Sequence, residues 1–235
     1  TVHALGAERI ARLSSSEGVK HLIHLSAIGA NKESESKSAR SKGEGEECVL
    51  KAFPTAVILR PSIVFGAEDS FFNRFSSMSR LSPFIPLVGA ETIFQPVYVD
   101  DIAQAALIAA RGSVPSGIYE LGGPDKETFR VLMARMLQVI RRKNIIINTP
   151  MPIAKMMSFS FDALQIITFG MFKNVIITRD QVTQLIVDNV VTTDFGSFED
   201  FKIRPKSMDA VLETYLYRYR PYGQYTSIHE SADSN

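Results

Sequence analysis

The sequence has a single cysteine and almost no excess charge of either sign. Because Cys48 has no partner thiol in the chain, a disulfide-stabilised secreted scaffold is excluded and a reducing compartment is expected. The 26 Lys and Arg residues nearly balance the 25 Asp and Glu residues, giving a formal net charge of +1 over 235 residues. They are scattered and form no basic stripe, so we expect no nucleic acid partner.

Metal ligands and targeting signals are also scarce. The four histidines and one cysteine do not form a zinc-binding set, and His21 and His24 are spaced to point to opposite faces of a strand. We therefore predict no metal site. The first residues contain no basic region followed by an apolar run, so no signal or transit peptide is visible. They resemble the middle of a helix, and we expect further residues upstream of Thr1.

Apolar residues make up 45% of the chain, which is enough for a hydrophobic core. Short apolar runs alternate with stretches of helical spacing over the first 150 residues. Strands are predicted at 21–26, 55–60, 117–121 and 145–148, and helices at 2–13, 39–53, 102–111 and 129–143. Asp100 and Thr128 are the predicted N-caps of the last two helices. This alternation predicts an α/β layer fold with parallel strands and right-handed crossovers.

The chain changes character after Pro150. Residues 151–172 are apolar and rich in Met and Phe, with Lys155 and Asp162 among the few interruptions. A charge in the middle of the run disfavours a membrane span, so we expect the segment to pack in the core or to face a partner protein. Two further helices are predicted at 179–188 and 207–220.

No Gly-x-Gly-x-x-Gly motif is present. In dinucleotide-binding folds this motif joins the first strand to the first helix and lets the backbone approach a pyrophosphate. Gly43 and Gly45 form one Gly-x-Gly pair, but they lie at the start of a polar helix and do not follow a strand. We interpret them as helix-packing glycines, and predict that this chain alone does not bind a pyrophosphate in the usual way.

Other motifs resemble the atypical extended short-chain dehydrogenase/reductase (SDR) superfamily. The resemblance is carried in part by His-Leu-Ser-Ala-Ile-Gly-Ala at 24–30 and Leu-Arg-Pro-Ser-Ile-Val-Phe-Gly at 59–66. The Arg-Pro-x-x-x-x-Gly pattern at 60–66 and Val-Asp-Asp at 99–101 mark the superfamily as a whole. Those that narrow the resemblance are Phe-Gln-Pro-Val-Tyr at 94–98, Thr-Arg-Asp at 178–180 and Tyr-Arg-Pro at 219–221. The second group resembles the branch that supplies the NADPH-binding accessory subunit of respiratory complex I, over essentially the whole chain.

This resemblance implies a Rossmann-like parallel sheet flanked by helices, a smaller, mainly helical C-terminal subdomain, and a nicotinamide nucleotide site. In the family, the backbone after the Arg-Pro pair faces the nicotinamide carboxamide and a helix lysine binds ribose hydroxyls. The cofactor-binding residues carried over to this sequence are Ser26, Ala27, Lys42, Pro61, Ser62, Ile63 and Val64. NADPH is the expected cofactor, provided that the missing Gly-rich half is present.

Active SDR enzymes carry a Tyr-x-x-x-Lys pair on one helix face, where the ammonium lowers the pKa of the phenol. Lys42 matches the lysine, but the residue four positions earlier is Ser38. A serine hydroxyl with no adjacent base is a poor proton donor near neutral pH. We therefore predict no catalytic residue and a cofactor that is bound without turnover.

Two functions agree with these motifs. The first is a non-catalytic NADPH-binding accessory subunit of mitochondrial complex I that supports its assembly or stability. The resemblance then implies complex I partners near the quinone module and a peripheral position on the matrix side of the mitochondrial inner membrane. The alternative is an active NAD(P)-dependent reductase or epimerase acting on a small molecule such as a quinone. The sequence also agrees with a bacterial member of the same branch that works in the cytoplasm.

The predicted domains are 1–124, the second half of an SDR-like dinucleotide-binding domain; 125–222, the mainly helical C-terminal subdomain; and 223–235, a loose tail. A sheet that begins at the 21–26 strand has an open edge, which is a liability in a soluble chain. We therefore expect an upstream segment or a separate polypeptide to complete the sheet.

Overall fold

The computed structural model describes residues 2–150, 152 and 179–223. Three parallel strands form its central sheet in the order β1-β2-β7. These strands are β1 (Ile23–Leu25), β2 (Val57–Pro61) and β7 (Gly117–Leu121). The parallel pairing predicted from the alternating pattern is therefore confirmed.

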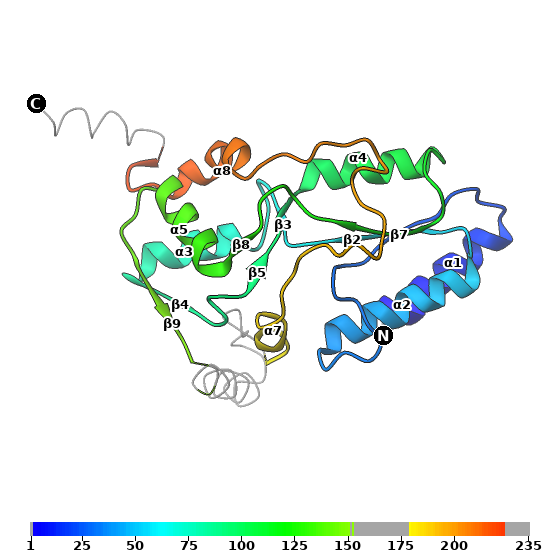
Figure 1. The fold of residues 1–235 in the computed structure, drawn as a ribbon, viewed down its shortest axis with the longest axis horizontal. Coiled ribbons are helices and arrows are strands. Elements are labelled where there is room, and N and C mark those ends of the chain that lie inside the picture. Colours follow the sequence, from blue (N-terminus) through cyan, green and yellow to red (C-terminus); the bar gives the residue numbers. More distant parts are fainter. Residues whose placement is uncertain (1, 151, 153–178, 224–235) are drawn as a thin grey trace, which may run out of the picture.

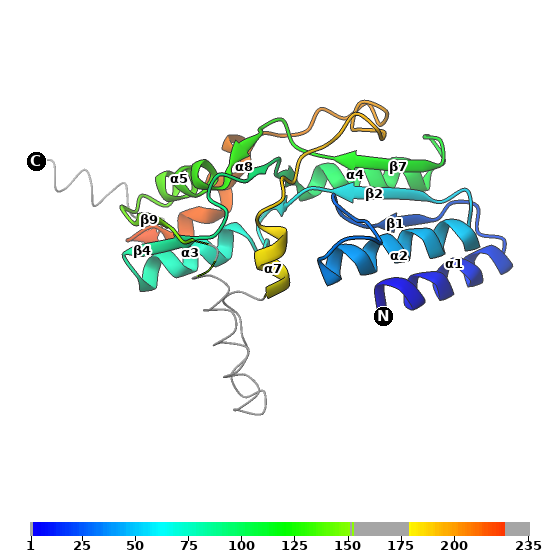
Figure 2. The same cartoon turned by 60° about the horizontal axis from the view of Figure 1, so that its bottom comes forward.

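Helices cover both faces of this sheet (Figure 1, Figure 2). The pair α1 (Ala7–Ser16) and α2 (Lys37–Ala52) lies on one face, and α4 (Val99–Ala110) lies on the other. Ile58 and Leu59 of β2 are fully buried because successive side chains of a central strand point to opposite covered faces. The strand therefore needs the nearly continuous apolar run that the sequence shows.

A second group of elements packs beside the sheet. It contains two parallel pairs, β3 (Val64–Phe65) with β6 (Val97–Tyr98) and β4 (Phe84–Leu87) with β9 (Ile145–Asn148), and one antiparallel pair, β5 (Ile93–Phe94) with β8 (Glu127–Thr128). Its helices are α3 (Phe72–Leu81), α5 (Phe129–Val139) and α8 (Asp209–Leu216). Their shared core is aromatic and sulfur-rich, with Phe65, Phe72, Phe129, Met133 and Met136 almost wholly buried.

Several predicted limits are correct. The strands at 117–121 and 145–148 have the predicted bounds. Thr128 caps α5 as expected, since its hydroxyl accepts a hydrogen bond from the Val131 N–H. Gly43 is a packing glycine, because a Cβ at this position would lie 2.5 Å from the backbone nitrogen of Lys32.

The predicted N-cap of α4 is wrong. The helix begins at Val99, three residues before the predicted start, and its N-cap is Tyr98, so Asp100 and Asp101 both lie in the first turn. Asp101 is buried and accepts a hydrogen bond from the Lys206 N–H at 2.7 Å. Both carboxylates lie at the positive end of the helix dipole. The bond between Asp101 and a distant loop is not revealed by the local sequence.

Helix lengths also differ from prediction. The first helix is α1, preceded by a π-helical turn at Val2–Gly6, and the first strand keeps only residues 23–25 of the predicted 21–26. The helix predicted to reach Lys143 ends at Val139, because the backbone reverses at Arg141, where φ is 53°. The last helix stops at Leu216 and continues as a 3₁₀ turn at Tyr217–Tyr219.

The helix predicted at 179–188 is also shorter, and α7 covers only Arg179–Gln184. Asp188 and Asn189 leave the helical path to pair with β5. The apolar segment 151–172 lies outside the described residues except for Pro152, as does the predicted tail beyond Gly223.

A buried ion network joins α2 to the sheet. Glu46 accepts two hydrogen bonds from the Arg60 guanidinium, at 2.9 and 2.6 Å, and Glu120 lies 3.7 Å from the same group. Burial lowers the pKa of Arg60, but the bonds to Glu46 and the charge of Glu120 outweigh this effect and the pKa is raised. Arg60 therefore stays ionised and bridges α2, β2 and β7.

Loss of one partner from this network should be costly. We expect Glu46→Ala to lower the free energy of unfolding by about 3 kcal/mol, because it leaves the Arg60 charge buried with an incomplete set of partners. Glu47→Ala is the matched control, since Glu47 pairs with Lys51 and Lys32 at the surface, where solvent screens the charges and the loss of stability should be much smaller. Urea unfolding measures both changes, and equal losses would contradict a special role for Glu46.

Candidate functional site

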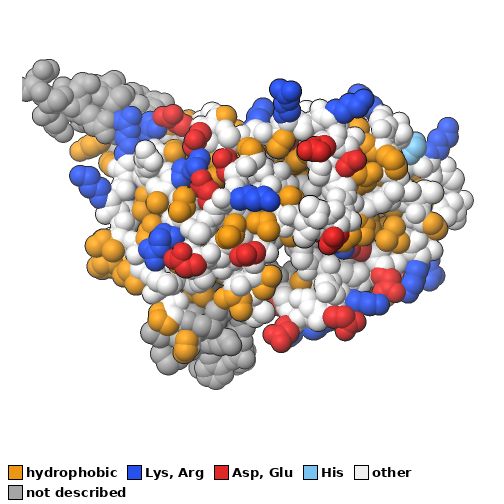
Figure 3. Space-filling model, viewed as in Figure 1, with side chains coloured by type: hydrophobic (Ala, Val, Ile, Leu, Met, Phe, Trp, Pro, Cys, Tyr) orange, Lys and Arg blue, Asp and Glu red, His pale blue; other side chains and the backbone are white. Residues whose placement is uncertain are grey.

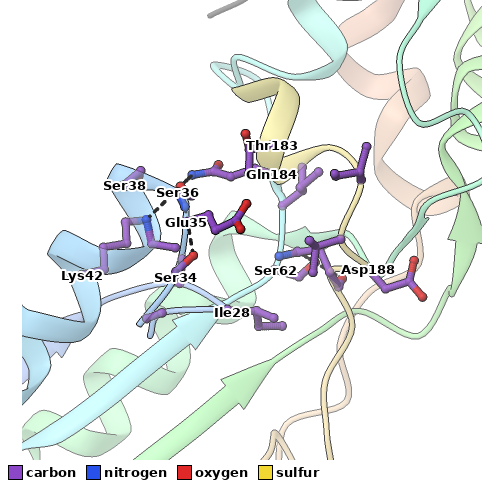
Figure 4. A pocket seen from close by; sticks show the side chains of 18 of the residues that line it. Ile28, Ser34, Glu35, Ser36, Ser38, Lys42, Ser62, Thr183, Gln184 and Asp188 are labelled. Carbon is purple, nitrogen blue, oxygen red and sulfur yellow. Dashed lines mark hydrogen bonds between the residues drawn. The ribbon is translucent and has the colours of Figure 1, made fainter. Parts of the chain in front are cut away.

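A cavity of about 440 Å³ lies at the carboxyl ends of β1 and β2. Its lining comes from four segments, the loop after β1 at 27–30, the start of α2 with its preceding loop at 34–42, the loop after β2 at 61–63, and the segment 183–189. Figure 4 shows Lys42, Ser36 and Gln184 on one side of the cavity and Ser62 and Asp188 on the other. Its volume falls in the range of small-molecule sites.

Five of the seven predicted cofactor-binding residues line this cavity: Ala27, Lys42, Pro61, Ser62 and Ile63. The two others lie beside it. Ser26 directly precedes the lining and is buried, and its hydroxyl has no hydrogen-bond partner among the described residues. Val64 is half-buried on β3, where it pairs with Val97, and does not reach the lining.

The backbone between β1 and β2 is held firmly. The Ile28 N–H donates to the Pro61 carbonyl at 3.0 Å, and the Ser62 N–H donates to the Leu121 carbonyl at 2.9 Å. The Ile63 carbonyl accepts from the Val97 N–H at 2.9 Å, whereas the Ile63 N–H has no acceptor among the described residues. The lining after β2 therefore keeps one main-chain donor uncommitted.

Lys42 supplies the cation of the site. Burial lowers the pKa of its ammonium, and the charge of Glu46, one helical turn away, only partly offsets this effect. Glu46 is itself bonded to Arg60. No described residue forms a hydrogen bond or an ion pair with the Lys42 ammonium, so this group is available to a ligand.

The phenol of the SDR catalytic pair has no replacement in the described lining. Ser38 occupies the position four residues before Lys42 and lines the cavity. Tyr98 instead packs against Phe65, and the Tyr119 hydroxyl donates to the Pro115 carbonyl at 2.8 Å. Among the lining residues that the structure describes, the titratable groups are Glu35, Lys42 and Asp188.

One wall of the cavity was not predicted. The Thr-Arg-Asp motif at 178–180 lies next to this wall, but nothing in the sequence indicates that residues 183–189 face Lys42 and Ser62. Asn189 carries this contact, because its side-chain oxygen accepts from the Ser62 hydroxyl at 2.6 Å. Only the folded chain brings these positions together, across 127 residues of sequence.

No family model matches the chain. It is 35% identical over 222 residues to "NADH dehydrogenase (ubiquinone) 1 alpha subcomplex subunit 9, mitochondrial" of Arabidopsis thaliana, with 92% of this chain and 55% of that protein covered. The Mus musculus protein of the same name is 31% identical, with 91% and 55% covered. A ceramide reductase of Caulobacter vibrioides is 28% identical, with 63% and 46% covered. The chain thus spans about half the length of the curated relatives it matches.

Solved structures show the fold. The dTDP-glucose 4,6-dehydratase of Bacillus anthracis, crystallised with NAD, has a TM-score of 0.62 at 12% identity and covers 97% of this chain and 68% of its own. The enzyme WbmG of Bordetella bronchiseptica, also with NAD, has a TM-score of 0.61 at 14% identity, with 92% and 64% covered. These structures confirm the predicted Rossmann-like fold, and the curated relatives confirm the resemblance to the complex I branch. None of the described helices has both the length and the apolar character needed to cross a bilayer.

Replacing Lys42 should reveal its buried charge as a dependence of stability on pH. Because the folded state lowers the pKa of Lys42, the unfolded chain binds the proton more tightly, and wild-type stability rises with pH between the folded and the ordinary pKa. We expect Lys42→Met to be more stable than wild type at pH 7, with the difference shrinking as the pH approaches about 10.

Urea unfolding at pH 7 to about 10 measures this difference. Lys51→Met is the control, because Lys51 is exposed and its bond to Glu47 raises its pKa. This variant should not gain stability at pH 7. An equal gain in both variants would show that the effect does not come from the burial of Lys42.

Proposed function

We propose that this chain, which is homologous over about nine tenths of its length to the proteins named NADH dehydrogenase (ubiquinone) 1 alpha subcomplex subunit 9, is a nucleotide-binding accessory part of respiratory complex I. The observation that carries this proposal is the composition of the cavity. Lys42 and Ser38 both line it, and by the SDR resemblance Lys42 matches the lysine that binds ribose and Ser38 matches the phenol of active members.

The described residues suit the nicotinamide end of NADPH. The Lys42 ammonium would donate to the ribose hydroxyls, and the uncommitted Ile63 N–H would donate to the carboxamide oxygen. When bound, NADPH supplies a hydride donor. Two solved structures of the same fold hold NAD, which supports a nicotinamide nucleotide as the ligand.

The pyrophosphate needs a further segment. Within the described residues β1 pairs only with β2, so its other edge is open, and Leu25 is 61% exposed. Exposed apolar side chains also lie on the π-helical turn before α1, at Leu5, and on α1 itself, at Ile10 and Leu13. We infer that residues 1–124 are the second half of a dinucleotide-binding domain, completed by an upstream segment or a separate polypeptide that brings the Gly-rich loop. NADPH binding depends on that segment.

Turnover is disfavoured by the chemistry of the site. A hydride transfer to a carbonyl needs a proton donor near the reacting oxygen, and Ser38 has no adjacent base to supply one. The lowered pKa of Lys42 does not compensate, because the lysine acts in the family by holding the nucleotide and by tuning a phenol. We therefore propose a nucleotide that is bound for structure and exchanged slowly.

An exposed apolar face supports assembly with other subunits. The parallel pair β4 and β9 buries one face and exposes Phe84, Ile145 and Ile147 on the other, and Leu81 next to β4 is 89% exposed. Figure 3 shows hydrophobic side chains gathered over this end of the molecule. Contiguous exposed apolar residues mark interaction surfaces. We propose that this face contacts complex I subunits near the quinone module, on the matrix side of the mitochondrial inner membrane.

The second candidate function is an active NAD(P)-dependent reductase. A relative named ceramide reductase favours it, although that match covers 63% of this chain. The cavity composition opposes it, since the described lining contains no tyrosine, histidine or cysteine.

Native mass spectrometry of the purified full-length protein, together with a single-turnover assay, separates the two functions. We expect co-purified NADPH and no oxidation of it in the presence of quinone or carbonyl compounds. Lys42→Ala should weaken NADPH binding about tenfold or more, because a charge-assisted contact is lost. Lys51→Ala, on the exposed last turn of the same helix, should bind as wild type does. Hydride transfer that disappears in Lys42→Ala would overturn the accessory role.

A further inference from the structure

Residues 180–189, which we call the strap, are bonded to both sides of the cavity. At one end, the strap contacts the start of α2, and at the other it contacts the loop after β2 and the strand β5. Figure 4 shows Gln184 of the strap beside Ser36, and Asp188 on the opposite side near Ser62. The strap thus crosses the cavity from the lysine side to the predicted nicotinamide side.

Asp180 holds the α2 end. The first N–H groups of a helix have no acceptor within the helix, and here the Asp180 carboxylate accepts from the Lys37 N–H at 2.6 Å and from the Ser38 N–H at 3.2 Å. It also accepts from the hydroxyl of Ser36, which is itself buried and is the N-cap. A carboxylate at a helix N-terminus is further stabilised by the helix dipole.

Gln184 reinforces this end of the strap. Its side-chain amide donates to the Ser36 hydroxyl at 2.8 Å and contacts the Asp180 carboxylate at 3.4 Å. The Ser36 hydroxyl in turn accepts from the Ala39 N–H at 3.2 Å. The first turn of α2 is therefore held by side chains that are more than 140 residues away in sequence.

The other end of the strap is held by Asp188 and Asn189. The Asp188 carboxylate accepts from the Ile93 N–H at 2.8 Å, and the Asn189 N–H donates to the Ile93 carbonyl at 2.8 Å. The Ser62 hydroxyl donates to the Asn189 side chain. Ile186 and Val187, between the two ends, line the cavity.

We propose that Asp180 is the positioning residue of the nucleotide site. By fixing the start of α2 to the strap, it sets the place of Lys42, about one turn further along the helix, and keeps the strap closed over the nicotinamide end of the ligand. This inference rests on the proposed NADPH binding. A strap held at both ends hinders the exit of a ligand that lies between it and residues 61–63, so loss of the Asp180 contacts should speed release.

The test compares release of NADPH from wild type, Asp180→Ala and Asp180→Asn, each in the full-length protein. The fluorescence signal of bound NADPH is followed over time after rapid dilution, and the rate at which this signal is lost gives the dissociation rate. We expect Asp180→Ala to release NADPH about tenfold faster, because charge-assisted hydrogen bonds are lost. Asp180→Asn keeps one acceptor oxygen and should fall between wild type and Asp180→Ala, which also provides a variant if the alanine protein does not fold.

Asp209→Ala is the matched control. Asp209 is also a first-turn carboxylate, but it lies on α8, pairs with Arg135 and is absent from the cavity lining. Its removal should leave the release rate unchanged. Equal acceleration in Asp209→Ala and Asp180→Ala, or no acceleration in either Asp180 variant, would overturn the role of Asp180 and leave the proposed function standing.

Hydrogen exchange gives a readout that does not depend on the nucleotide. The amides of Lys37 and Ser38 should exchange faster in Asp180→Ala than in wild type, while the amides of α5 and of the central sheet should be unaffected. Unchanged exchange at Lys37 and Ser38 would contradict the positioning role. Absence of NADPH binding by the wild-type full-length protein would overturn the proposed function and the retention of ligand together, and this result is distinguishable from a failure of Asp180 alone.

Discussion

The Arg60 guanidinium, buried between Glu46 and Glu120, fixes the distance between α2 and the central sheet. Glu46 lies one helical turn after Lys42, so the same contact determines where the Lys42 ammonium meets the cavity. A buried ion pair adds little net stability but is costly to break, and its geometry is strongly directional. The shape of the cavity therefore depends on an ion pair whose residues do not line it.

A second constraint acts from the far side of the cavity. The strap satisfies the backbone donors at the start of α2 and the side chain of Ser62, groups that lie on different elements. Backbone polar groups at helix starts and strand ends lack partners within their own element, and here residues of the distant strap supply the hydrogen-bond partners. The site is thereby pre-organised before any ligand enters, which suits a protein that holds a nucleotide better than one that must admit a second substrate.

The sequence allowed the sheet and one half of the site to be predicted. Buried strands such as 117–121 are marked by local apolar runs, and the carboxyl ends of adjacent parallel strands meet at one edge, which brings Ala27, Pro61 and Ser62 together. The rest depends on long-range contacts. The N-cap of α4 is Tyr98 and not the predicted Asp100, and local sequence does not reveal the hydrogen bond from the Lys206 N–H to Asp101 in the first turn. The shortened α7 and the strap depend on pairing with Ile93, for the same reason.

The contact between Asp180 and the start of α2 also has a consequence for the order in which the site is completed during synthesis. A ribosome completes Lys37 well before Asp180, and 143 positions separate the two partners. Until the later residue emerges, the Lys37 and Ser38 N–H groups lack their Asp180 acceptor, and the cavity lacks the wall that the strap forms. Native contacts of such large sequence separation slow folding. A nascent chain that stalls before this point would present the cavity without residues 183–189, which form one of its walls.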